Sequence, residues 1–114
     1  MNIIKKTALT FFMAICLANV TAYAEDAANA SATSTNETIA HIENALVEVN
    51  KSDFFAANLH LKAARLSSER ITGDAVIIKQ ANADVVQGQI ESRTGDVKKS
   101  SALLSKALEL YKSL

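Results

Sequence analysis

Residues 72–96 read TGDAVIIKQANADVVQGQIESRTGD, and this stretch decides the fold. The same three residues, Thr-Gly-Asp, stand at both of its ends. A glycine at such a position lets the chain leave a helix in the left-handed conformation, and the aspartate that follows caps the next helix. The stretch therefore predicts a helix over 75–93, with a stop at Gly73 before it and a stop at Gly95 after it.

Three more helices are predicted outside this stretch. The turn Lys51-Ser52-Asp53 separates a helix over 36–50 from a helix over 54–71, with Asp53 as the N-cap of the second. The last helix runs from 97 to the C-terminus. Apolar residues recur in the first helix at the spacing of one helix face; they are Ile39, Ile42, Leu46 and Val49.

The short connections force neighbouring helices to run antiparallel. We therefore predict an all-α fold, an up-down-up-down antiparallel four-helix bundle built from two helical hairpins, over 36–114. Ser34 and Glu37 form a capping-box pattern that opens its first helix. Residues 25–35 are small and polar with nothing to bury, which predicts a flexible leader.

The composition argues against several classes of protein. The chain of 114 residues has no proline and three glycines, too few for the many turns of a sandwich or barrel. Twelve basic and twelve acidic residues leave no basic excess for a phosphate backbone, so we predict no nucleic-acid partner. The sequence has no Gly-rich phosphate loop, nucleophile elbow or His-Glu-x-x-His motif, so we predict that the protein is not an enzyme.

Residues 1–24 are predicted to be a secretory signal peptide. Lys5 and Lys6 precede an apolar run over 8–20, and Ala22-Tyr23-Ala24 provides the small residues of a cleavage site. The run is shorter than the ~20 residues that span a bilayer, so we expect no stable membrane anchor after cleavage. The mature protein would be periplasmic or secreted, and it would lack cysteine because Cys16 is removed.

The helix over 75–93 carries two further signals. Gly88 lies in its interior, where glycine costs about 1 kcal/mol relative to alanine, and this predicts the close approach of another helix. The solvated stripe of this helix is predicted to consist of Gln80, Asp84, Gln87 and Glu91.

Both histidines of the chain fall in the first predicted hairpin. His60 lies opposite the polar stripe of its helix, so we expect it to point into the bundle interior. That stripe consists of Asn58, Lys62, Arg65 and Glu69. His41 lies on the preceding helix, beside Glu37 and Glu48. Counted from the turn between the helices, the two histidines are offset by about 4.5 Å along the axis.

Two interpretations of these histidines remain open. In the first, an interior histidine is satisfied by a hydrogen bond to a backbone carbonyl, an asparagine or a carboxylate. In the second, His41 and His60 ligate a divalent metal ion, with Glu37 or Glu48 as a third ligand. Copper or zinc suits such a set of imidazole and carboxylate groups.

The segments around the two histidines resemble the repeats of the small metal-binding protein family; they read AHIENAL at 40–46 and LHLKAA at 59–64. Members of that family are exported, cysteine-free four-helix bundles in which a histidine recurs on each helix and divalent metals such as copper bind. The resemblance implies the same fold, and it implies metal binding at His41 and His60. On the helix over 75–93, the position that corresponds to a family histidine holds Gln80. On the last helix, that position falls near Leu104.

The sequence leads to two hypotheses of function. The first is an exported binding protein with a low capacity for a divalent metal ion, or with a role in stress. The alternative is a metal-free helical protein-interaction module, similar to tetratricopeptide repeats in its ending Leu108-Glu109-Leu110-Tyr111, although the turn at 51–53 recurs only after 43 residues, at 94–96. Such a module would bind a protein partner through an apolar groove or through a polar strip that consists of Asn82, Gln89 and Arg93.

Overall fold

The computed structural model describes residues 26–114, which form four α-helices and no strand. They are α2 (Asp26–Asn50), α3 (Phe54–Ser68), α4 (Ala75–Arg93) and α5 (Val97–Lys112). The predicted all-α four-helix bundle is therefore confirmed. The predicted signal peptide at 1–24 lies outside the described residues.

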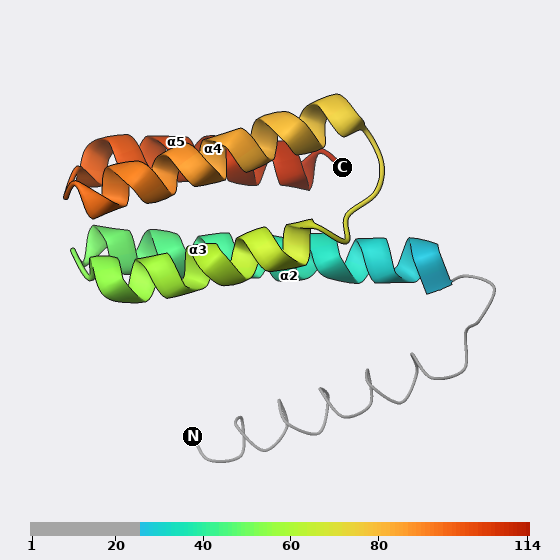
Figure 1. Ribbon diagram of the computed structural model, residues 1–114, viewed down its shortest axis with the longest axis horizontal. Coiled ribbons are helices and arrows are strands. Elements are labelled where there is room, and N and C mark those ends of the chain that lie inside the picture. Colours follow the sequence, from blue (N-terminus) through green and yellow to red (C-terminus); the bar gives the residue numbers. More distant parts are fainter. Residues whose placement is uncertain (1–25) are drawn as a thin grey trace, which may run out of the picture.

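The four helices are arranged as two antiparallel hairpins. Figure 1 shows α2 and α3 side by side in the lower layer, and α4 and α5 side by side in the upper layer. The layers meet along two further contacts, because α2 packs against α5 and α3 packs against α4. Each helix thus has two neighbours, and the core lies between the layers. None of the described helices is both long enough and apolar enough to cross a membrane.

The three capping aspartates act as the sequence predicts, whereas Gly73 lies several residues beyond the end of α3 and does not end that helix. The carboxylate of Asp53 accepts a hydrogen bond from the backbone N–H of Ala56 at 3.1 Å, and Asp74 and Asp96 cap α4 and α5 in the same way. Gly73 and Gly95 have φ angles of 140° and 82°, which a larger side chain would strain. The helices α4 and α5 therefore begin at the predicted residues. The helix α3 is shorter than predicted, since it ends at Ser68, and α5 ends at Lys112, just before the C-terminus.

The first helix begins ten residues earlier than predicted, at Asp26, so residues 26–35 of the expected leader are helical. Ser34 does not cap this helix but lies buried inside it. This segment is helical because it packs against a distant part of the chain. The Ser31 hydroxyl accepts a hydrogen bond from the Thr72 backbone N–H at 2.8 Å, and so ties α2 to the loop between α3 and α4. Small polar residues suit this closely packed interface, although alone they are typical of a linker.

The core contains small side chains and hydroxyl groups beside its aliphatic residues. Alanine provides five of its apolar members; they are Ala45, Ala57, Ala64, Ala81 and Ala107. Between α2 and α3, the hydroxyls of Thr38 and Ser67 lie 2.6 Å apart and share a hydrogen bond. Between α4 and α5, the Ser100 hydroxyl donates to the Gly88 carbonyl at 2.8 Å. These hydroxyls are hydrogen-bonded, so their burial leaves no polar group without a partner.

Gly88 packs directly against α5, and this close approach agrees with its place in the helix. A β-carbon added to Gly88 would lie 2.8 Å from Cδ2 of Leu104 and 3.0 Å from its Cγ. Leu104 is fully buried, so it has no open space into which to move. The absence of a side chain at Gly88 therefore sets the separation of these two helices.

Tyr111 is the largest fully buried side chain, and it connects three helices. Its hydroxyl, on α5, donates to Oδ1 of Asn82 on α4 at 2.8 Å. The same oxygen accepts a hydrogen bond from the Ser68 hydroxyl, at the end of α3, at 2.9 Å. Burial raises the pKa of the Tyr111 phenol above its ordinary 10.0, and hydrogen bonding by Ser68 offsets this only in part.

The raised pKa of Tyr111 predicts a loss of stability in alkali. The folded protein holds the phenolic proton more tightly than the unfolded chain does. The contribution to stability is therefore fully present below pH ~10 and is lost as the pH rises above that value. Denaturant unfolding between about pH 9 and pH 11 checks this, with Tyr111→Phe as the control. The pH-dependent difference between the two proteins isolates Tyr111 from the lysines. An equal loss in both would contradict the assignment.

The pKa itself can be read from ultraviolet absorbance of the phenolate. The chain has two tyrosines, so Tyr23→Phe leaves Tyr111 as the single reporter. We expect its folded-state transition to lie above that of the same variant in denaturant.

Candidate functional site

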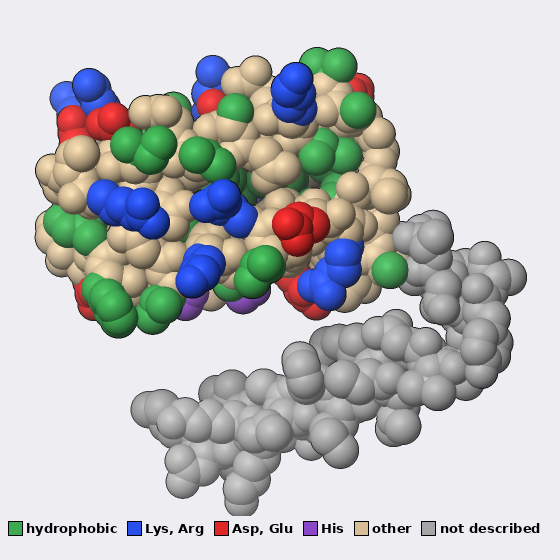
Figure 2. All heavy atoms as spheres, in the orientation of Figure 1, with side chains coloured by type: hydrophobic (Ala, Val, Ile, Leu, Met, Phe, Trp, Pro, Cys, Tyr) green, Lys and Arg blue, Asp and Glu red, His purple; other side chains and the backbone are tan. Residues whose placement is uncertain are grey.

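The two histidines lie at the edge of the α2–α3 interface. His60 is half-buried on α3, and the prediction that it points into the interior is not met. The fully buried face of α3 passes through Ala57, Leu61 and Ala64, so His60 lies to the side of it. His41 is half-buried on α2. In Figure 2 both histidines reach the surface along the lower edge of the view.

The two predicted carboxylate ligands face other partners. Glu37 Oε2 lies 3.6 Å from a guanidinium nitrogen of Arg70, and Glu48 Oε1 lies 3.4 Å from Nζ of Lys51. Within residues 26–114, no three His, Cys, Asp or Glu side chains gather in a way that can hold a metal ion. The structure therefore does not assemble His41, His60, Glu37 and Glu48 into one site. Copper or zinc binding stays a prediction from the sequence.

The helix α3 has an exposed apolar row opposite its buried face. The side chains of Phe55, Leu59 and Leu66 are 78%, 56% and 61% exposed. Spacings of four and seven residues put all three on one side of the helix. The sequence contained the signal for this row, because the polar stripe of the helix is too narrow to cover its whole solvent side. Periodicity alone did not show which apolar residues the bundle leaves uncovered.

An open groove of about 440 Å³ runs beside this row, between α3 and α4. From α3 it is lined by Lys62, Arg65, Leu66, Ser68 and Glu69, the last just beyond the helix end, and from α4 by Asn82 and Val86. The groove therefore combines apolar side chains with positively charged ones. Figure 2 shows this face of the molecule, with Lys and Arg side chains across its middle and hydrophobic side chains on both sides.

The predicted polar strip of α4 faces this groove and is partly used inside the bundle. Gln89 is buried, and its Oε1 accepts a hydrogen bond from the Arg65 guanidinium at 3.1 Å. Asn82 binds Ser68 and Tyr111 as described above. Arg93 is exposed. The strip thus joins α4 to its neighbours, and Arg93 is its only member left fully open to solvent.

The predicted solvated stripe of α4 needs one correction. Asp84 is 6% exposed, because the same side of α4 carries Gly88 and is covered by α5. One of its carboxylate oxygens accepts a hydrogen bond from Gln80 Nε2 at 3.4 Å. The other has no partner among the described residues.

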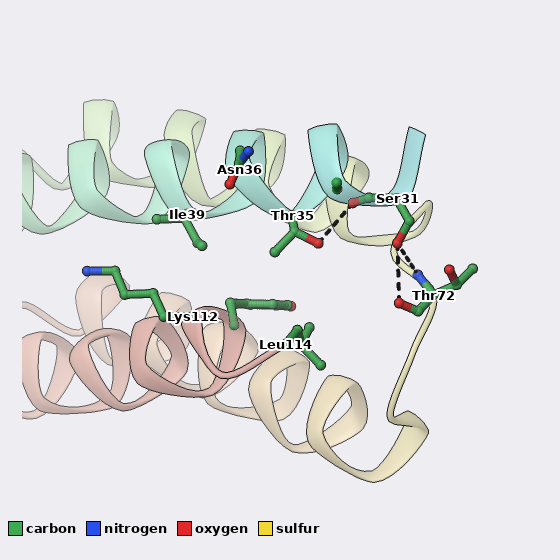
Figure 3. Close-up of a pocket in the computed structure, with 9 residues that line it drawn as sticks. Ser31, Thr35, Asn36, Ile39, Thr72, Lys112 and Leu114 are labelled. Carbon is green, nitrogen blue, oxygen red and sulfur yellow. Dashed lines mark hydrogen bonds between the residues drawn. The ribbon is translucent and has the colours of Figure 1, made fainter. Parts of the chain in front are cut away.

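A second groove, of about 620 Å³, lies between the N-terminal half of α2 and the C-terminal end of α5. Figure 3 shows Thr35 and Ile39 of α2 facing the end of α5, with Ser31 bonded to Thr72 at the edge. The hydroxyls here already have partners, since Thr35 donates to the Ser31 carbonyl at 2.9 Å. The α3–α4 groove, with its uncovered apolar row, is therefore the candidate site.

A search with models of known protein families found no match to this chain. A comparison with curated proteins found no significant similarity either. The resemblance of 40–46 and 59–64 to the small metal-binding protein family rests on those residues alone.

Proposed function

We propose that the protein is a non-enzymatic helical interaction module that binds a protein partner across α3 and the α3–α4 groove. One observation carries the proposal: Phe55, Leu59 and Leu66 form a row of large apolar side chains that no described part of the chain covers. Groups of large exposed apolar side chains on one face of a soluble domain often mark a surface that binds a partner.

The spacing of these side chains supports a helical or extended partner. Residues at positions i, i+4 and i+11 lie along one side of α3, and a helical or extended segment can contact all three when it runs along that side. Because α3 uses its opposite face for the core, a partner can bind without disturbing the fold. The predicted export of the protein would restrict this partner to the periplasm or the exterior.

Site-specific photocrosslinking tests the proposal in the cells that make the protein. A benzoylphenylalanine residue replaces Leu59 in one variant and the exposed Ser105 of α5 in a matched control. We expect a discrete adduct with one protein from position 59 and none from position 105. The purified partner is then expected to bind the wild-type chain directly.

Two further substitutions control this experiment. Phe55→Ser combined with Leu66→Ser is expected to remove the adduct, while the free energy of unfolding stays within about 0.5 kcal/mol per site because both side chains are exposed. Equal crosslinking from positions 59 and 105, or an adduct that survives the double substitution, would contradict the proposal.

A further inference from the structure

The groove between α3 and α4 is bordered by positive charge. Lys62 and Arg65 line it from α3. On α4, Lys79 lines the adjoining hollow beside Asn82, and Arg93 lies one helical turn beyond Gln89, which bonds Arg65. Among the described residues that line the groove, Glu69 contributes the carboxylate. Two cations, Lys62 and Arg65, thus line the groove together with one carboxylate, and Lys79 and Arg93 lie near it on α4.

These four cations have no acidic partner in the part of the chain that the structure describes. The ion pairs there involve Lys51, Arg70 and Lys112 instead. Arg65 bonds Gln89, whose amide is neutral and leaves the guanidinium charge uncompensated. The groove therefore keeps its positive potential for a ligand of opposite charge.

Apolar side chains lie along both sides of this charged band. Leu59 and Leu66 border it on α3, and Ile90, which is 45% exposed, follows Val86 by one turn on α4. A matching ligand therefore needs carboxylates toward the centre and apolar side chains toward the edges. An amphipathic helix of about 15 residues is as long as α3, about 22 Å.

We propose, as a consequence of the function proposed above, that the partner presents an acidic amphipathic helix to the α3–α4 groove. An acidic helix is favoured over a second copy of the chain or a lipid surface because its charge complements that of the groove. A second copy of the chain docking through the same face would put cations against cations, because a two-fold interface uses the same patch twice. Lys62 and Arg65 line a groove between two helices, and a groove of that shape fits a rod-like segment.

Peptide binding to the full chain tests the charge of the partner. The probe is a labelled synthetic helix of leucine and glutamate, and its matched control has glutamine in place of every glutamate. We expect the glutamate peptide to bind at least about tenfold more tightly at low salt, and we expect that advantage to shrink at high salt.

Charge reversal locates the binding site. Lys62→Glu with Arg65→Glu is expected to weaken binding of the glutamate peptide by at least about tenfold. The control is Lys98→Glu with Lys106→Glu, which changes the net charge equally on exposed positions of α5. It is expected to leave affinity within about twofold. Equal losses in both pairs would overturn the assignment to the α3–α4 groove.

Other outcomes of these experiments distinguish a failure of the acidic-helix inference from a failure of the proposed function. If both peptides bind equally and Phe55→Ser with Leu66→Ser abolishes that binding, the acidic partner is overturned and the interaction module stands. If neither peptide's binding depends on Phe55 and Leu66, the apolar row is overturned as well. Tighter binding to phosphatidylglycerol vesicles, or self-association that Lys62→Glu with Arg65→Glu removes, would overturn the acidic helix in favour of a membrane or a second copy.

Discussion

Replacing Tyr111 with alanine is expected to lower the free energy of unfolding by about 3–5 kcal/mol, as for other large buried side chains. The side chain is 1% exposed, and its hydroxyl bonds Asn82 on a neighbouring helix. A domain of this size has a total stability of about 5–10 kcal/mol. The variant should therefore lose roughly a third to all of that stability. Urea unfolding monitored by circular dichroism measures the change.

Tyr111→Phe separates the ring from the hydroxyl. It keeps the packing and removes one hydrogen bond, so we expect a loss of about 1 kcal/mol. Ser68 continues to donate to Oδ1 of Asn82, which spares that oxygen the full cost of an orphaned acceptor. If the alanine and phenylalanine variants were equally stable, Tyr111 would not be the packing centre that its burial indicates.

Gly88→Ala is expected to destabilise the protein by about 1–3 kcal/mol, although alanine is the better helix former. The new methyl group would lie 2.8 Å from Cδ2 of the fully buried Leu104. Relief requires the buried Leu104 side chain to shift or α4 and α5 to move apart, and either change loosens the packing between the two helices. Thermal unfolding measures the effect, and each kcal/mol corresponds to a shift in Tm of about 4–8 °C.

Ala83 provides the matched control on the same helix. It is exposed, so Ala83→Gly should destabilise by about 1 kcal/mol through helix propensity alone. Alanine is thus favoured over glycine at 83 and disfavoured at 88. A double-mutant cycle with Leu104→Ala should show that the two changes are less harmful together than their sum. A stabilising Gly88→Ala would show that the helices are not held at this separation by Gly88.

The sequence predicted those parts of the fold that depend on local chemistry. Asp53, Asp74 and Asp96 cap helices through backbone groups two or three residues away, and Gly73 and Gly95 adopt conformations that their own lack of a side chain permits. Such signals act within one turn of the chain. The boundaries of α4 and α5 follow from them without knowledge of the rest of the protein.

The parts that the sequence did not predict depend on contacts between distant residues. Ser31 and Ser34 are typical of a linker until Thr72 and the helix α3 are placed beside them. Asp84 is buried because α5 covers it, and no pattern within α4 reveals that cover. The sequence also did not reveal the uncovered row at Phe55, Leu59 and Leu66, because whether an apolar face is buried or exposed depends on which helices pack beside it.

The small hydroxyl-containing core has a consequence for how the protein responds to temperature. The heat capacity of unfolding rises with newly exposed apolar area and falls with newly exposed polar area. When interfaces made of alanine and of hydroxyl pairs such as Thr38 and Ser67 unfold, they expose little apolar area and some polar area. The heat capacity change per residue should therefore fall below the usual ~12–15 cal/mol/K, which gives a broad, shallow stability curve. We therefore expect the bundle to stay folded over a wide range of temperature, with a modest maximum free energy of unfolding.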